Sequence, residues 1–411
     1  MLRHVREIFG AERSPIFVFG FIVLFWTMAD SVGQYIAPLM IQNQGFSNTV
    51  IGFILGFSSI AGAFFDFWAG KIFKNTDFRR IFLVMFALCS IYPLLLWSAN
   101  TITLFLFAMA IWGVYFDLYG FGTFDFIGRY SNKDTHASNF GIAQMFRALG
   151  QLLAPLIVGF VIVEGIDWRS FGLYWLFLLI AFAFLLVLFL MYHKRSPQKE
   201  VIKPRRRHFF IELRLWRKMG WHMMPILFVT FYLWSIDAFF WTLSPLYPGA
   251  VGLPAQFGGF MLAAFVFPVL IVGWFVGSLT KRFGKKRTAI VSLLAGSAVL
   301  SFFTLAPNPF LGLLVVLLAS FFTSVALPSI NSWFTGYIYD VPALEGETEG
   351  LADLAQNTAY IFGPFFAGVL ADVVGIASAF TILGLVGFLA AAVLLFLTPN
   401  KIFIPVKKSE I

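Results

Sequence analysis

The chain has 411 residues, of which 60% are hydrophobic, 19% aromatic and 12% charged, with a formal net charge of +9. Soluble domains carry about 25% charged residues, so this composition excludes an ordinary soluble protein and indicates an integral membrane protein. The single cysteine, Cys89, excludes an intramolecular disulfide and a cysteine metal cluster.

Apolar runs of about 20 residues recur along the chain, and each is long enough to cross a hydrocarbon core of about 30 Å. The first run is preceded by charged residues, but it is long enough to span and has no small-residue cleavage site, so we expect no cleavable signal peptide. We predict an all-α integral membrane protein with twelve transmembrane helices, at residues 15–40, 48–70, 81–99, 103–128, 139–163, 171–192, 222–247, 256–279, 288–305, 310–336, 350–371 and 376–398.

The basic residues follow alternate breaks between these spans. The breaks that hold Lys and Arg are those after the second, fourth, sixth and eighth spans, at 71–80, 128–134, 193–218 and 280–287. The other breaks contain no base except Arg169. Basic loops stay on the cytoplasmic side, so we expect a multi-pass protein of the cell membrane with both termini in the cytoplasm. Because the charge follows the topology and forms no single patch, nucleic-acid binding is not expected.

The two halves of the chain repeat at an offset that drifts only from 207 to 209 residues. The matched pairs are Asp30 and Asp237, Pro38 and Pro245, Gly52 and Gly259, Gly70 and Gly277, Gly141 and Gly350, Pro155 and Pro364, and Gly159 and Gly368. We therefore expect two pseudo-symmetric six-helix bundles, at 1–192 and 222–411. The linker at 193–221 is basic, and its segment 209–218 is typical of an amphipathic helix on an anionic membrane surface.

The segment "GSLTKRFGKKR" (277–287) resembles the loop signature of the major facilitator superfamily, and "GKIFKNTDFRR" (70–80) is a degraded copy of it. Lys74 and Lys281 stand where the family usually has aspartate, so the local salt bridges must differ. The resemblance covers essentially the whole chain. It implies the superfamily fold, in which spans 1, 4, 7 and 10 line a central cavity and spans 5 and 11 flank it.

The fifth span contains "GQLLAPLIVG" (150–159), which is similar to an element associated with proton-coupled antiporters in this superfamily. Gly150, Pro155 and Gly159 match the element, whereas Ala154 and Val158 replace glycines. The alternative is a helix-packing device, because the eleventh span contains the comparable "GPFFAG" (363–368) and small residues allow close helix contact.

Polar side chains inside the spans are the candidate functional residues, since such groups are costly in a membrane and usually face a cavity. Burial favours the neutral form of a carboxyl group, which suits a proton carrier, a cation site or a Na⁺ site. We assign proton coupling to Asp30, Asp117 and Arg147. We expect Arg147, whose charge is permanent, to pair with Asp117 or, as second choice, Asp125. The substrate-binding candidates are Trp26, Gln34, Gln144, Gln151, Asp237, Trp241, Asn331 and Asn357.

We interpret the charged residues at the cytoplasmic ends of the spans as a gate. The break at 339–353 holds five acids and no base, and we expect it to pair with the basic loops when that side closes; a solvated acidic loop is the alternative. The residues assigned to the gate are Lys71, Lys74, Arg79, Arg80, Lys281, Arg282, Glu349 and Asp353.

The sequence favours one of three classes of function. A membrane enzyme is disfavoured, because all five histidines lie in tails or at span ends and no nucleotide-binding loop or metal-ligand cluster occurs. A proton-coupled antiporter that exports a hydrophobic or cationic compound is the leading hypothesis. The alternatives are a proton-coupled symporter for a neutral solute such as a sugar, and a lipid flippase. We expect a monomer in the lipid bilayer, with a small-molecule substrate and protons as partners and no cofactor.

Overall fold

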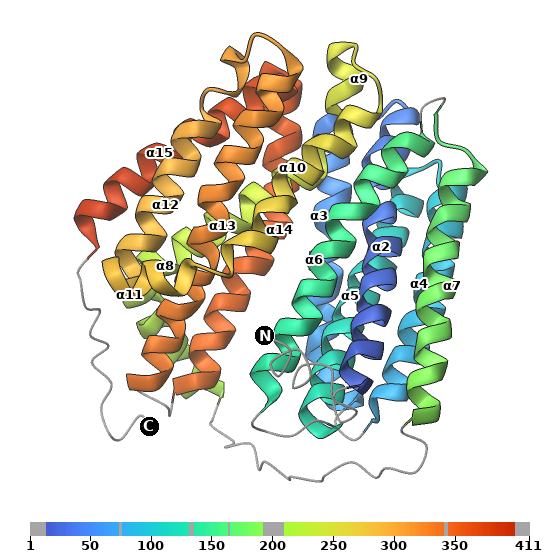
Figure 1. Cartoon of the computed structure of the whole chain (residues 1–411), viewed down its shortest axis with the longest axis horizontal. Coiled ribbons are helices and arrows are strands. Elements are labelled where there is room, and N and C mark those ends of the chain that lie inside the picture. The colour runs from blue at the N-terminus through green and yellow to red at the C-terminus, as the bar shows by residue number, and fades with distance from the viewer. Residues whose placement is uncertain are drawn as a thin grey trace, which may run out of the picture. The chain divides into compact units, whose positions relative to one another are not determined.

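The computed structural model describes residues 14–73, 76–130, 135–162, 165–191, 209–340 and 344–398, and within them every element is a helix (Figure 1). The first six are α2 (Ser14–Asn43), α3 (Asn48–Ile72), α4 (Phe78–Ser98), α5 (Ile102–Tyr130), α6 (His136–Val161) and α7 (Trp168–Met191). The others are α8 (Phe209–Leu243), α9 (Tyr247–Val251), α10 (Gln256–Val272), α11 (Val276–Phe283), α12 (Lys285–Leu300), the 3₁₀ turn η3 (Phe303–Leu305), α13 (Pro309–Asp340), α14 (Glu345–Val374) and α15 (Ile376–Leu397).

The number of membrane-spanning helices agrees with the prediction. In the described ranges, 11 helices are long and apolar enough to cross a membrane, or 12 if α10 and α11 form one span. These two helices are bent by 68° relative to each other. The break falls at the turn around Gly273, shortly after Pro268, which removes a backbone donor from α10. The all-α membrane architecture is therefore confirmed, and the segment predicted as the eighth span, 256–279, is interrupted by this bend.

The helices divide into two compact units. Unit 1 comprises Met1–Phe46, Phe57–Val201 and Pro248–Ala263, and unit 2 comprises Ser47–Gly56, Ile202–Tyr247 and Ala264–Ile411. Thus α3 and α10 each contribute residues to both units. The segment 209–218, expected to lie on the membrane surface, is the first part of α8 and is continuous with the seventh span. Its placement at a surface stays a prediction, as do the domain boundaries.

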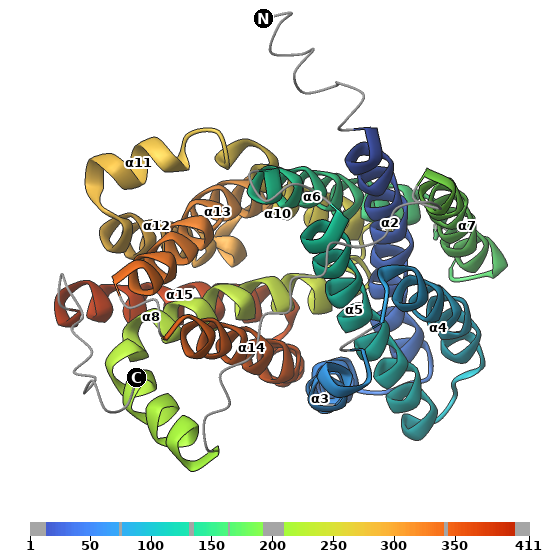
Figure 2. The ribbon, with the colours of Figure 1, turned by 90° about the horizontal axis from the view of Figure 1, so that it is seen from below.

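Two helix pairings recur in the two units, α2 with α6 as α8 with α14, and α4 with α5 as α12 with α13. In unit 1, α2 lies against α6 and α7, and α4 lies against α5 (Figure 1). In unit 2, α8 lies against α14, and α12 lies between α13 and α15 (Figure 2). The exposed side chains of these spans are mostly apolar, as lipid contact requires.

Two glycines from the repeat make matching close contacts. A Cβ atom on Gly52 would collide with the carbonyl of Pro364 in unit 2, and a Cβ atom on Gly259 would collide with the carbonyl of Pro155 in unit 1. Both obstacles are backbone atoms of a helix, which cannot rotate away as a side chain can. Because the Pro155 element has the same contact as its repeat partner, close helix packing accounts for it.

Candidate functional site

Asp30 is the centre of a buried polar network in unit 1. It is 3% exposed, and three side chains donate hydrogen bonds to it. Oδ1 accepts from Trp112 Nε1 at 2.8 Å and from the Tyr115 hydroxyl at 2.9 Å, while Oδ2 accepts from Gln34 Nε2 at 2.7 Å. Three donors on one carboxyl group compensate for much of the cost of removing it from water.

Helix geometry explains why these donors converge. Asp30 and Gln34 are four residues apart on α2, and Trp112 and Tyr115 are three residues apart on α5, so each pair lies on one face of its helix. Tyr115 is fully buried and packs at the edge of the buried ring of Tyr92. The donors are thus held by packing as well as by their hydrogen bonds to Asp30.

An aromatic stack lies beside this network. The rings of Trp26 and Tyr119 are stacked, with centroids 4.0 Å apart and planes 13° apart. Trp26 is 1% exposed and its indole donates to Cys89 Sγ at 3.4 Å. In this conformation Trp26 is therefore part of the interior of unit 1 and supports Tyr119; its assignment to substrate binding stays a prediction.

Arg147 lies against aromatic rings and not against the expected carboxylate. Its guanidinium carbon lies 5.1 Å from the Phe116 ring centre and 5.7 Å from that of Tyr119, and no described carboxylate lies within 4.0 Å of it. The expected pair with Asp117 or Asp125 is not formed. The reason is geometric: Phe116 and Tyr119 share a face of α5, whereas Asp117 follows Phe116 directly and points about 100° away around the helix.

Asp117 instead faces α3. A Cβ atom on Gly62 would lie 2.6 Å from Asp117 Oδ2, so the missing side chain of this glycine makes room for the carboxyl group. Asp117 Oδ2 is buried and has no hydrogen-bond partner within the described part of the chain. Asp66 lies one turn after Gly62 on α3. A buried carboxyl oxygen without a partner is costly when charged.

Two other carboxyl groups of unit 1 bind the start of α4. Asp77 accepts from Arg79 N at 2.9 Å as the N-cap, and Asp125 accepts from Phe78 N at 2.9 Å. The Tyr130 hydroxyl donates to Asp77 at 2.7 Å. Burial, followed by this hydrogen bond, raises the pKa of Tyr130 above its usual range. Asp125 thus caps a helix.

In unit 2, the repeat partner Asp237 accepts a hydrogen bond from a tyrosine. It is half-buried, and its Oδ2 accepts from the Tyr360 hydroxyl at 2.6 Å. The Tyr360 ring lies 5.7 Å from that of Trp234, so an acid and two aromatics meet at the contact of α8 with α14. Trp241 is 8% exposed and is part of the interior of unit 2.

The remaining candidates lie apart from these networks. Gln144 and Asn331 are exposed, and Gln151 and Asn357 are half-exposed. Among the gate residues, Lys74 and the Lys71 side chain lie outside the described residues. The described members are exposed or half-exposed on α4, α11 and α14, namely Arg79, Arg80, Lys281, Arg282, Glu349 and Asp353. Their pairing stays a prediction.

Asp372 is a residue that the sequence gave no reason to single out. It lies in the last turn of α14, where a negative charge opposes the helix dipole. Its oxygens accept from the backbone N–H and side-chain amide of Asn48 at 3.0 and 2.9 Å, and from the backbone N–H and hydroxyl of Thr49 at 2.8 and 2.6 Å. One carboxylate from α14 therefore caps the N-terminus of α3 within unit 2.

Trp112 and Tyr115 were also missed. Their i, i+3 spacing on the fourth span was a usable signal, but aromatic residues are so common in this chain that two more attracted no attention. Within the described residues no group of three or more His, Cys, Asp or Glu side chains is placed to hold a metal ion.

Comparison with known proteins gives the same fold. A family model described as Major Facilitator Superfamily matches residues 16–340 and 238–409. No match was found among curated proteins. The chain is similar in structure to a bacterial homologue of the human lysosomal transporter Spinster, solved in an inward-facing, unoccupied conformation (TM-score 0.68, 15% identity, 95% of this chain and 97% of that one covered).

Two further structures are similar over nearly their whole length. One is the nucleoside transporter NupG (TM-score 0.70, 12% identity, 93% and 98% covered). The other is a POT family transporter in complex with 5-aminolevulinic acid (TM-score 0.71, 14% identity, 95% and 97% covered). At these identities the likeness establishes the fold and leaves the substrate open.

Proposed function

The chain belongs to the Major Facilitator Superfamily, and from this premise we propose that it is a proton-coupled secondary active transporter that moves a small organic solute by alternating access. Asp30 is the proton-coupling group in this proposal. The substrate class is a hydrophobic or cationic organic compound, exchanged for protons.

The hydrogen bonds of Asp30 carry the coupling proposal. A coupling carboxyl group must be stable both with and without its proton. The Tyr115 hydroxyl can donate to the charged form and can accept from the protonated one, and Gln34 can present either its amide N–H or its carbonyl after a flip. Trp112 only donates and keeps the group oriented in both forms. The site therefore accommodates both protonation states without a change in packing.

Asp117 is the second candidate in the proposed proton path. Its Oδ2 atom is buried and has no hydrogen-bond partner among the described residues, and Asp66 lies on the same face of α3 as Gly62. Arg147 takes a different role, because it lies on aromatic rings: its fixed positive charge favours the charged form of any acid nearby.

The proposed substrate class rests on the pairing of acids with aromatic rings. Asp237 with Tyr360 and Trp234 offers one negative charge and two ring faces, which suit an organic cation. A neutral solute such as a sugar is the alternative. It would use amide side chains, but Gln34 is already bonded to Asp30. A flippase on this fold is the third possibility. Export no longer draws support from the Pro155 element, since packing accounts for it.

Alternating access needs contacts that form in one state and break in the other. The break before α3 carries no basic residue, so in the proposed topology the Asp372 cap lies on the outer side. We propose that the hydrogen bonds of Asp372 keep the outer ends of α3 and α14 together in the state that is closed on that side. The basic and acidic residues assigned to the cytoplasmic gate would make the opposite closure.

The test begins with a thermal-shift screen of the purified protein against organic cations, sugars, nucleosides and peptides. A compound that stabilises the protein is then assayed in liposomes with an imposed pH gradient. Uptake of an organic cation into liposomes that are acidic inside supports antiport. Accumulation of a neutral solute along with protons supports the symport alternative. Flux of lipid but of no solute would overturn the proposal in favour of a flippase.

A further inference from the structure

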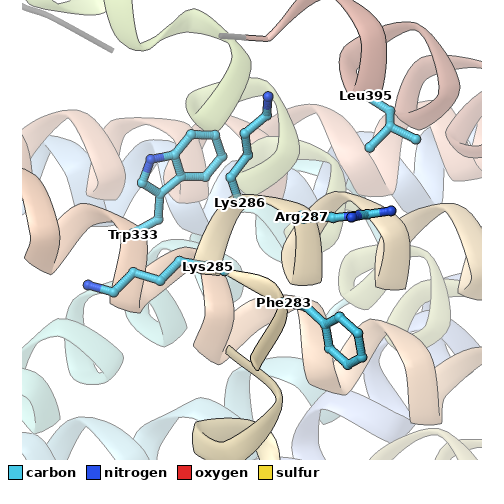
Figure 3. Close-up of a pocket in the computed structure, with 7 residues that line it drawn as sticks. Phe283, Lys285, Lys286, Arg287, Trp333 and Leu395 are labelled. Atoms are coloured by element: carbon cyan, nitrogen blue, oxygen red, sulfur yellow. The ribbon is translucent and has the colours of Figure 1, made fainter. Parts of the chain in front are cut away.

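A basic pocket lies in unit 2 at the junction of α11 and α12, away from the Asp237 contact. Its volume is about 670 Å³, which is in the range of small-molecule sites. The residues that line it are Phe283, Gly284, Lys285, Lys286, Arg287, Trp333 and Leu395. Figure 3 shows Lys286 beside the Trp333 indole and Arg287 extending toward Leu395, while Lys285 extends the opposite way.

The lining carries three positive charges and no acid. No carboxylate of the described residues lies within 4.0 Å of Lys285 or Arg287. The Lys286 ammonium donates to the Thr398 carbonyl at the end of α15, and this contact fixes its position beside the pocket. The Lys285 ammonium lies near Gly336 of α13. Lys286 thus contacts the end of α15 and Lys285 lies near α13, while the side chains of Lys285 and Arg287 are exposed.

The three cations lie at a helix end that normally favours acidic residues. Lys285, Lys286 and Arg287 are the first three residues of α12, where the helix dipole stabilises negative charge, and the first turn contains no acid. The preceding residue, Gly284, adopts a φ of +85° and offers no capping side chain. Three cations at this end of α12 repel one another and are repelled by the positive end of the helix dipole. An anion bound in the pocket would reduce both repulsions.

Exposed apolar side chains occur in the pocket lining and next to it in sequence. Phe283 is 51% exposed, and Phe396 and Leu397, directly after Leu395, are 86% and 74% exposed. Trp333 supplies an aromatic ring of the kind found at membrane interfaces. A ligand that contacts both the cations and the apolar side chains would combine an anionic head group with apolar chains. A free anion would contact the cations alone.

We propose that this pocket binds the phosphate group of an anionic phospholipid of the cytoplasmic leaflet, with Lys285, Lys286 and Arg287 supplying the positive charge of its lining and the acyl chains along the exposed side chains of Phe283 and Phe396. The break at 280–287 is one of the basic breaks expected on the cytoplasmic side, where anionic lipids attract such clusters. This inference does not depend on the transported substrate or on proton coupling.

The test is thermal unfolding of the full-length protein in detergent, titrated with short-chain phosphatidylglycerol, phosphatidylcholine or inorganic phosphate. Phosphatidylglycerol should raise the unfolding temperature most. Each Lys→Gln or Arg→Gln change in the pocket should weaken its apparent affinity by about fivefold, and all three together by about 100-fold. The single variants keep the test informative if the triple variant does not fold.

The matched control is the double variant Lys281→Gln and Arg282→Gln, which removes two bases of α11 outside the pocket. It should retain the phosphatidylglycerol effect. If the control loses as much apparent affinity for phosphatidylglycerol as the pocket variants, the proposed site is wrong. It is also wrong if phosphatidylcholine raises the unfolding temperature equally. Protection by inorganic phosphate equal to that by phosphatidylglycerol would overturn the lipid assignment, since a soluble anion would then be the ligand.

Discussion

Replacing Asp372 by alanine should weaken the contact between the end of α14 and the start of α3. The substitution removes a carboxylate that accepts four hydrogen bonds of 2.6–3.0 Å. Loss of a helix N-cap costs roughly 0.5–2 kcal/mol, and because Asp372 is exposed we place the effect near 1–1.4 kcal/mol after screening by solvent. Such a change shifts a two-state equilibrium by about five- to tenfold. The state with these helix ends separated should gain that much population.

The assay is a spin-label distance measurement between cysteines introduced at the exposed positions Gln44 and Val373. Cys89 is buried and can remain. Thr49→Val, which loses only the hydroxyl bond, should give less than half of the shift. Asp167→Asn, an exposed acid that caps the N–H of Arg169, is the control and should leave the distances unchanged. An unaltered distance distribution in Asp372→Ala would refute the reasoning.

Three other predictions concern packing and the Asp30 network. Gly52→Ala should lower the unfolding temperature in detergent because its new Cβ would collide with backbone; Gly120→Ala, which meets no atom within 4 Å, should be neutral or gain up to about 1 kcal/mol. Arg147→Lys keeps the charge but loses the planar stack, and thermal unfolding should show a cost of about 0.5–2 kcal/mol; no change would mean that the rings do not hold it. Tyr115→Phe should cost about 1–3 kcal/mol and alter the pH profile of transport. An unchanged pH profile would separate Tyr115 from coupling through Asp30.

The features that could be predicted from the sequence are those with a strong period or a repeat. Runs of apolar residues predicted the spans. Polar residues inside the first span marked Asp30 and Gln34 as candidates, and the two side chains are joined by a hydrogen bond. The break between α10 and α11 was not predicted, because Pro268 and Gly273 lie in an apolar run that has no polar residue to mark its interruption.

Side-chain partners were harder to predict than faces. Arg147 was expected to pair with an acid because a buried charge needs compensation, but the rings of Phe116 and Tyr119 provide it. The choice between Phe116 and its neighbour Asp117 depends on the rotation of α5 about its axis, which a helix that is apolar on most of its faces does not specify. The Asp372 cap joins residues 324 positions apart, and no local pattern predicts such a contact.

The central claim, that Asp30 couples transport to protons, is tested most directly with Asp30→Asn in liposomes. Asparagine has nearly the same shape and can keep the bonds from Trp112 and Tyr115, but it cannot exchange a proton. The account predicts that flux driven by a pH gradient is lost while solute exchange at equal pH continues. Flux that still follows the pH gradient in this variant would contradict it.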